Sequence, residues 1–215
     1  MFKYLLFDLD NTLYSSRHGL EENVGRRIRE FVAGYLGVTP DEAWCQRKAS
    51  MGKYGTCLEW LVAEKGFTDT ETYLAAIHPG DEADSLPPDG ELRDFLSGIS
   101  IPKAILTNSP REHADLILDK LGLHGLFTHI FDIRLCGFIG KPRREVFDNA
   151  LKTLGVRAEE VLFIDDGPVY VEGFIAIGGK GLVLDENDIH KNCALPRIRD
   201  LKELIQYIEP FSKLG

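Results

Sequence analysis

Three short apolar runs in this chain each end abruptly in small polar or acidic residues. The runs are residues 3–7, followed by Asp8-Leu9-Asp10; residues 104–106, followed by Thr107-Asn108; and residues 161–164, followed by Asp165-Asp166. A short apolar run bounded by turn-forming residues indicates a strand buried on both faces. Helical patterns separate the three runs, and strands that alternate with helices predict a parallel, doubly wound sheet. Such sheets bind ligands at the carboxyl ends of their strands, which is where the polar residues fall.

The remaining core elements follow from weaker patterns. Helices are predicted at residues 112–121 and 144–154, and further strands near residues 130–133 and 182–184. The predicted fold is therefore α/β, with a Rossmann-like sheet.

Between Tyr14 and Leu86 the pattern becomes helical. Apolar residues recur at helical spacing from Val24 to Tyr35, and two segments have the form of a capping box: residues 39–42 and residues 68–71. We interpret this stretch as a helical cap inserted after the first strand. The predicted domains are a core of residues 1–13 and 89–215 and a cap of residues 14–88.

Charge and cysteine content exclude several classes of function. The chain has 34 acidic and 25 basic residues and a net charge of −9, so it lacks the broad basic surface that would bind nucleic acid. The four cysteines are scattered without a C-x-x-C pair, which favours free thiols over a zinc site or a disulfide framework. No apolar segment has the roughly 20 residues of a membrane span, and the apolar start is too short for a signal sequence. We expect a cytoplasmic protein with no membrane partner.

The first polar cluster suggests phosphate chemistry that depends on a metal ion. Asp8 and Asp10 are two residues apart at a strand end, so on an extended chain their carboxylates point the same way, repel one another and favour a bound cation. Oxygen ligands beside a phosphate suit Mg²⁺, and Asp165-Asp166 would complete the site. Asp8 can attack phosphorus, while Asp10 can protonate the leaving oxygen and later deprotonate water.

The other clusters fit the same reaction. Thr107 and Asn108 offer hydrogen-bond donors to phosphate oxygens, and Lys141 offers a fixed positive charge for the transition state. Each cluster alone also has an ordinary explanation as a turn, a helix cap or a solvated lysine. The specific signal is their combination at one edge of one sheet.

These motifs resemble those of the haloacid dehalogenase-like hydrolase superfamily along essentially the whole chain. The matching segments are residues 8–12, Thr107-Asn108, Lys141-Pro142 and Asp165-Asp166. The resemblance implies Asp8 as nucleophile, Asp10 as acid and base, and Mg²⁺ held by Asp8, the Asp10 backbone carbonyl and the Asp165-Asp166 pair.

Within the superfamily, the chain is similar to the pyrimidine 5′-nucleotidase branch. The residues that carry this similarity are Phe7 to Tyr14, Tyr54-Gly55-Thr56, Ile77-His78, Thr107-Asn108 and His113-Ala114. It implies a nucleoside 5′-monophosphate as substrate, with pyrimidines favoured. From the residues themselves, we expect structural roles for His78 and His113.

The chain departs from the superfamily pattern in two places. Tyr170 stands where family members usually carry an Asn that braces the site, which leaves weakened activity open. Arg143-Arg144 follows Lys141-Pro142 in place of the usual Asp-Pro. We interpret the two arginines as helix-start residues, with added positive charge near the pocket as the alternative.

Alternative functions remain open. A sugar-phosphate or other small-metabolite phosphatase would use the same residues, and so would a phosphomutase in its first step. A dehalogenase is disfavoured because Asp10 and the acidic pair serve phosphate chemistry. A non-catalytic or degenerate phosphate-binding module, such as a signalling receiver domain, also combines an acidic cluster with Thr and Lys. Asp10 and the large cap argue against that module.

Overall fold

The core of the molecule is one six-stranded sheet in which all paired neighbours run parallel. The computed structural model describes residues 1–50 and 52–208. The strands are β1 (Tyr4–Phe7), β2 (Lys103–Leu106), β3 (His129–Phe131), β4 (Val161–Asp165), β5 (Lys180–Leu184) and β6 (Arg197–Ile198). Their order is β3-β2-β1-β4-β5-β6, with every pair parallel. The prediction of a parallel, doubly wound α/β sheet is confirmed; the two-residue strand β6 was not predicted.

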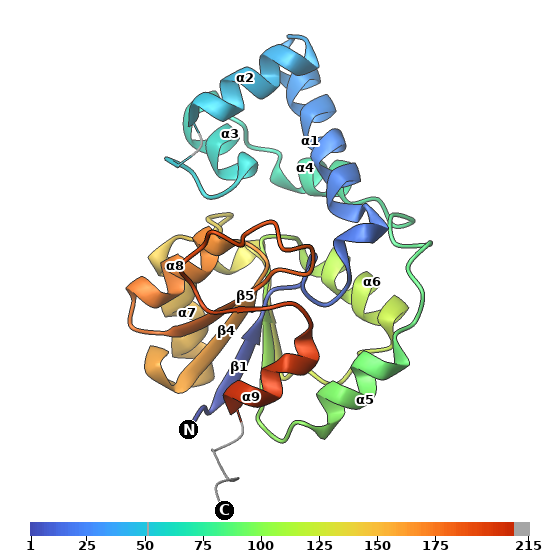
Figure 1. The fold of residues 1–215 in the computed structure, drawn as a ribbon. Coiled ribbons are helices and arrows are strands. Elements are labelled where there is room, and N and C mark those ends of the chain that lie inside the picture. Colours follow the sequence, from blue (N-terminus) through green and yellow to red (C-terminus); the bar gives the residue numbers. More distant parts are fainter. Residues whose placement is uncertain (51, 209–215) are drawn as a thin grey trace, which may run out of the picture.

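The central strands are largely apolar because helices cover both faces of the sheet. In β1, Leu5 and Phe7 pack into one hydrophobic cluster and Leu6 packs into another, as expected for side chains that alternate across a strand. The first cluster includes side chains of α5 (Gly90–Gly98) and α6 (Arg111–Leu121). The second includes side chains of α7 (Arg144–Leu154) and α8 (Pro168–Ala176), so the two helix pairs lie on opposite faces (Figure 1).

Short helices complete the described structure. Ser16–His18 is a 3₁₀ turn between β1 and the cap helices; the others are the 3₁₀ turns Ile133–Cys136, Ala158–Glu160 and Leu201–Leu204, and the helix α9 (Ile205–Ile208). The turn Leu201–Leu204 leads directly into α9, and its Leu201 and Leu204 are buried in the core.

Four helices between β1 and α5 form a separate layer above the carboxyl ends of the strands (Figure 1). They are α1 (Leu20–Leu36), α2 (Pro40–Ser50), α3 (Cys57–Lys65) and α4 (Thr70–Ile77). This cap has its own hydrophobic cluster, in which Trp60 is 1% exposed. The domain boundaries after residue 13 and after residue 88 stay a prediction.

The cap helices start much as their sequences indicate. Thr39 and Glu42 form the expected reciprocal capping box at the start of α2. The N-cap of α4 is Asp69, whose side chain accepts from the Thr72 N–H at 3.2 Å, so the prediction that Thr68 caps this helix is wrong. Aspartate is at least as good an N-cap as threonine, which explains the one-residue difference.

Two further expectations can be compared with the described part of the chain. There, the four cysteines are free thiols, as predicted. Within residues 1–50 and 52–208, no helix combines the length and the apolar character needed to cross a bilayer.

Candidate active site

The site lies at the topological switch point of the sheet, between the ends of β1 and β4. Asp8 follows β1 directly and donates its backbone N–H to the Ile164 carbonyl at 2.8 Å. Lys141 reaches the same place from a loop and donates to Asp8 Oδ1 and to Asp165 Oδ2, each at 2.6 Å. The lysine is 1% exposed and the Asp165 side chain is fully buried. The three motifs that supply these residues therefore meet in one buried ion-pair cluster.

The charges in this cluster do not balance. Burial raises the pKa of Asp8 well above its usual range, against the lowering effect of Lys141, and the carboxylates of Asp165 and Asp166 raise it further. Burial also opposes the charge on Lys141, but the Asp165 and Asp8 carboxylates raise its pKa overall. Carboxylate oxygens of Asp8, Asp165 and Asp166 lie within 4.8 Å of one another. Three carboxylates against one ammonium favour a bound divalent cation.

The two members of the acidic pair differ in how many of their oxygens are engaged. Asp165 accepts from Lys141 through Oδ2 and from the Gly167 N–H through Oδ1, at 2.8 Å. Among the residues that the structure describes, Asp166 has one long contact, from Asn11 Nδ2 to its Oδ2 at 3.4 Å. Burial and the neighbouring Asp165 raise the pKa of Asp166 to about 7. Asp166 thus has more free lone pairs for a cation than Asp165 has.

The Asp10 side chain is held apart from that cluster. Its Oδ1 accepts from Tyr14 at 2.6 Å and from His113 Nε2 at 2.7 Å, and its Oδ2 accepts from Ser109 at 2.8 Å. Burial alone would raise the pKa of Asp10, but the positive His113 and the hydrogen bonds from His113 and Tyr14 bring it below its usual range. The predicted repulsion between the Asp8 and Asp10 carboxylates contributes to the raised pKa of Asp8, but less than the repulsion from Asp165 and Asp166 does. The carboxylates gathered around Asp8 are Asp165 and Asp166.

A buried chain of charged side chains continues behind Asp10. His113 Nδ1 contacts Glu82 Oε1 at 2.5 Å, and His78 Nδ1 contacts the same oxygen at 3.0 Å. Arg27 contacts the other Glu82 oxygen and donates to the Ile77 carbonyl at 2.7 Å. Burial would lower the pKa of His113, but Asp10 and Glu82 raise it to about 10. Sequence reasoning missed Glu82, which lies in an irregular segment with no motif around it.

The second motif braces the lysine loop. Asn108 Oδ1 accepts from the Lys141 N–H at 2.7 Å, and Asn108 Nδ2 donates to the Lys141 carbonyl at 3.3 Å. The Thr107 hydroxyl accepts from the Ser109 N–H at 3.0 Å, which leaves its own proton free to donate. Both residues line the cavity described below. Of the two side chains predicted to donate to phosphate, Asn108 thus already has a structural partner.

The two departures from the family pattern have different surroundings. The Tyr170 ring lies 5.0 Å from Lys141 Nζ, close enough for a cation–π contact, and lines the cavity. Arg143 pairs with Glu59 of the cap at 3.0 Å, and Arg144 pairs with Asp148 one turn further along α7. Neither arginine lines the cavity, so they are a cap contact and a helix-surface pair.

A cavity of about 330 Å³ lies between this floor and the cap. The floor is polar and includes Asp8, Asp10, Thr107, Asn108, Lys141 and Asp166. The walls are largely apolar and include Val24, Ile28, Trp44, Leu58, Leu74 and Ile77. Arg47 also lines it, and among the described residues its buried Nη1 has no hydrogen-bond partner. The site is thus charged at the sheet and apolar at the cap.

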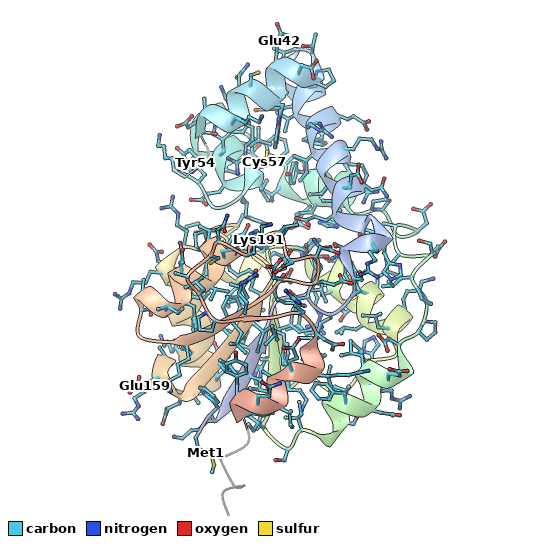
Figure 2. The ribbon with its side chains drawn as sticks, viewed as in Figure 1. Met1, Glu42, Tyr54, Cys57, Glu159 and Lys191 are labelled. Carbon is cyan, nitrogen blue, oxygen red and sulfur yellow. The ribbon has the colours of Figure 1, made fainter. Side chains whose placement is uncertain are left out.

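The cap touches the floor through a pair of glycines. A Cβ on Gly55 would lie 2.6 Å from the Lys141 carbonyl oxygen, and a Cβ on Gly140 would lie 2.5 Å from Thr56 Cγ2. Only glycine, which has no Cβ, leaves room for both of these contacts. Tyr54 and Cys57, on either side of this contact, lie at the end of the cap that faces the core (Figure 2). The segment Tyr54-Gly55-Thr56 therefore sets the cap against the lysine loop.

Comparison with known proteins identifies the family. A family model described as haloacid dehalogenase-like hydrolase matches residues 2–178. The solved structure of a haloacid dehalogenase-type phosphatase from Thermococcus onnurineus has a TM-score of 0.64 at 21% identity, over 96% of this chain and 97% of that one. The L-2-haloacid dehalogenase of Xanthobacter autotrophicus has a TM-score of 0.60 at 15% identity, over 97% and 100%. At these identities the two structures establish the fold alone.

Curated relatives are more similar in sequence. Glyceraldehyde 3-phosphate phosphatase of Methanocaldococcus jannaschii is 25% identical over 97% of this chain and 99% of its own length. Validoxylamine A 7′-phosphate phosphatase of Streptomyces hygroscopicus is 27% identical over 78% of each chain. Phosphate metabolism protein 8 of Saccharomyces cerevisiae is 28% identical over 82% of this chain but 59% of its own length. With the family model matching most of its length, this chain belongs to the haloacid dehalogenase-like hydrolases.

Proposed function

We propose that this hydrolase is a magnesium-dependent phosphatase that acts on a small phosphorylated metabolite through an aspartyl-phosphate on Asp8. The observation that carries the proposal is the buried cluster of Asp8, Lys141 and Asp165 at the base of the cavity. Two of the relatives described above are named as phosphatases of small phosphate esters, which supports the same reaction class.

The chain's own residues account for both halves of the reaction. An Asp8 oxygen attacks phosphorus while the bond from phosphorus to the leaving oxygen breaks. Asp10 enters this half in its protonated form, gives its proton to the leaving oxygen and becomes a carboxylate. Water then attacks the phosphorus of the aspartyl-phosphate, the bond to Asp8 breaks, and Asp10 takes the proton from water. Lys141 holds Asp8 and offers positive charge to the phosphate oxygens.

The donor set fits magnesium. Asp8 and Asp166 would offer carboxylate oxygens to the ion, and Asp165, both of whose oxygens accept hydrogen bonds, would brace the site beside them. When bound, Mg²⁺ would neutralise the phosphate and lower its repulsion from the Asp8 carboxylate.

For the substrate, we propose a nucleoside 5′-monophosphate, with pyrimidines favoured. The cavity volume of about 330 Å³ lies at the small end of the range for small-molecule sites. Its apolar walls suit the faces of a base, with Trp44 available for stacking, and Arg47 Nη1 suits an acceptor such as a base carbonyl. Sugar phosphates or other small phosphate esters are the second candidate, because the relatives' names favour them.

One set of assays tests these proposals together. Turnover of 4-nitrophenyl phosphate should vanish in EDTA and return with Mg²⁺; full activity after thorough dialysis against EDTA would refute the metal requirement. Values of kcat/KM should then be compared for UMP, CMP, AMP, GMP and several sugar phosphates. A sugar phosphate that exceeds both pyrimidine nucleotides by tenfold, about 1.4 kcal/mol in the transition state, would reject the nucleotide substrate and leave the phosphatase intact.

A further inference from the structure

Asp10, His113 and Glu82 form a continuous buried bridge, which we name the acid/base bridge. His113 Nε2 lies 2.7 Å from Asp10 Oδ1, and His113 Nδ1 lies 2.5 Å from Glu82 Oε1. The His113 side chain is fully buried and that of Glu82 is 1% exposed. Carboxylates only accept, so His113 donates from both ring nitrogens and its position is set from both sides.

Glu82, at the end of the bridge away from Asp10, lies next to the cap. Glu82 lies in the segment that leads from α4 back to α5, whereas His113 lies in the first turn of α6 in the core. The partners of Glu82 are Arg27 of α1 and His78, the residue that ends α4. The bridge therefore joins the exit of the cap to the side chain beside the reaction centre.

A metal site is the other use that these side chains suggest. His78, Glu82 and His113 place ligand-type atoms within 4.8 Å of one another. Arg27, however, already occupies one Glu82 oxygen, and both His113 nitrogens already face carboxylates. Two cations, the guanidinium and the doubly donating imidazole, already balance the Asp10 and Glu82 carboxylates, so a further cation would be repelled.

The two oxygens of Asp10 are held unequally. Oδ1 accepts two short hydrogen bonds, from Tyr14 and His113. Oδ2 accepts one, from the Ser109 hydroxyl, which can rotate to release it. Oδ2 is therefore the oxygen available for proton exchange, and its direction is set by what holds Oδ1.

We propose that His113 is a positioning residue that orients Asp10 Oδ2 toward the reacting oxygen, and that Glu82 acts through His113 to maintain this orientation. The proposal rests on the phosphatase function and on Asp10 as its acid and base. It gives His78 and Arg27 a role as well, since they fix Glu82 at the point where the chain leaves the cap.

The test distinguishes a positioning role from a role in folding by using variants whose side chains resemble the wild-type ones in shape. With saturating Mg²⁺ and 4-nitrophenyl phosphate, His113→Gln should lower kcat about a hundredfold and change KM less than threefold, because misplacement of a reacting group acts on the chemical steps. Glu82→Gln keeps the shape and an acceptor oxygen, and should lower kcat about tenfold. The matched control is His124→Gln, at an exposed histidine outside the bridge, which should match wild type.

A double-mutant cycle makes the inference decisive. Phosphoenzyme decay is measured after rapid mixing and quenching. Because His113 acts through Asp10, decay in the double variant Asp10→Asn/His113→Gln should be no slower than in Asp10→Asn alone. Likewise, adding Glu82→Gln to His113→Gln should cause no further loss of rate. Multiplicative losses in either cycle, or a wild-type kcat in folded His113→Gln, would overturn the bridge. If wild type itself forms no phosphoenzyme, the phosphatase proposal fails instead. If wild type forms phosphoenzyme and His113→Gln has an unchanged kcat, the phosphatase function stands and the positioning role of His113 is rejected.

Discussion

The floor and the walls of the cavity are built on different physical principles. On the floor, the buried Lys141 ammonium donates hydrogen bonds to the buried carboxylates of Asp8 and Asp165. On the walls, apolar side chains of the cap predominate, and the guanidinium of Arg47 has a buried nitrogen without a partner in the described chain. A floor of fixed, hydrogen-bonded charges is preorganised for one reaction, whereas an apolar wall accepts different leaving groups. Chemistry and substrate choice should therefore respond to different substitutions.

The largest expected effect is on the floor. Asp8→Asn replaces the nucleophile with a nearly isosteric amide, so kcat should fall by several orders of magnitude, as removal of a covalent nucleophile does elsewhere. Circular dichroism should show an unchanged fold. The control is Asp94→Asn, at an exposed aspartate of α5, which should retain wild-type turnover. Retention of more than about a hundredth of the activity by folded Asp8→Asn would remove Asp8 from the mechanism.

The next effect tests whether the floor depends on charge balance. Lys141→Met leaves the buried Asp8 and Asp165 carboxylates without their ammonium partner, and in EDTA it should lower the free energy of unfolding by about 3 kcal/mol. Mg²⁺ should restore part of that loss, so the thermal midpoint of the variant should respond to Mg²⁺ more than that of wild type.

Lys152→Met, at an exposed lysine of α7, is the matched control and should change the free energy of unfolding by less than about 0.5 kcal/mol. Equal midpoints for wild type and Lys141→Met in EDTA would show that the buried lysine does not hold the floor together.

The floor was largely predictable from the sequence because a parallel sheet brings all its carboxyl strand ends to one edge. Local patterns at residues 7–8, 106–107 and 164–165 therefore carried long-range information. The hydrogen-bond partners of Asp10 were not predictable in this way. Strand β1 ends at Phe7 and Asn11 has a left-handed backbone with φ of 55°, so strand alternation does not indicate which side chains the Asp10 carboxylate meets.

The walls and the acid/base bridge were not predictable in the same way. His113 and Asp10 are 103 residues apart, and Glu82 lies 31 residues from His113 in a segment without regular structure. No sheet register connects these positions. Asp10 and His113 meet within the core, and Glu82 reaches His113 from the segment that leads from α4 back to α5. The helical period predicted the cap helices but not which of their aromatic residues faces the cavity.

Two cap tryptophans offer a comparison of packing with recognition. Trp60 is 1% exposed in the cap core, and Trp44 lines the cavity. Trp60→Leu should lower the free energy of unfolding by about 2 kcal/mol because it leaves a void. Trp44→Leu should cost less than about 1 kcal/mol and mainly raise KM for UMP, since it removes stacking surface. Denaturant unfolding and steady-state kinetics on both variants measure the two effects. If Trp44→Leu lowered stability more and Trp60→Leu raised KM more, the packing and recognition roles would belong to the opposite tryptophans.

The smallest expected effect concerns Arg47, and it is a change in the choice between substrates and not in the rate for all of them. Burial of a polar atom without a partner is costly, so a site with such an atom favours a ligand that supplies an acceptor. We expect Arg47→Met to lower kcat/KM about tenfold for UMP and for 4-carboxyphenyl phosphate, a difference of about 1.4 kcal/mol. Phenyl phosphate has no acceptor at its far end, so its kcat/KM should stay within about twofold, since no hydrogen bond is lost.

Arg47→Lys sharpens this last comparison because it keeps the charge and shortens the reach. If Nη1 meets the far end of the leaving group, lysine should recover at most part of the loss for 4-carboxyphenyl phosphate. An equal loss for phenyl phosphate and 4-carboxyphenyl phosphate would mean that Arg47 supports the fold of the cap and does not read the substrate. If the ratio of variant to wild-type kcat/KM falls only for substrates that carry an acceptor, Arg47 on the cavity wall selects the substrate and the catalytic residues of the floor are unaffected.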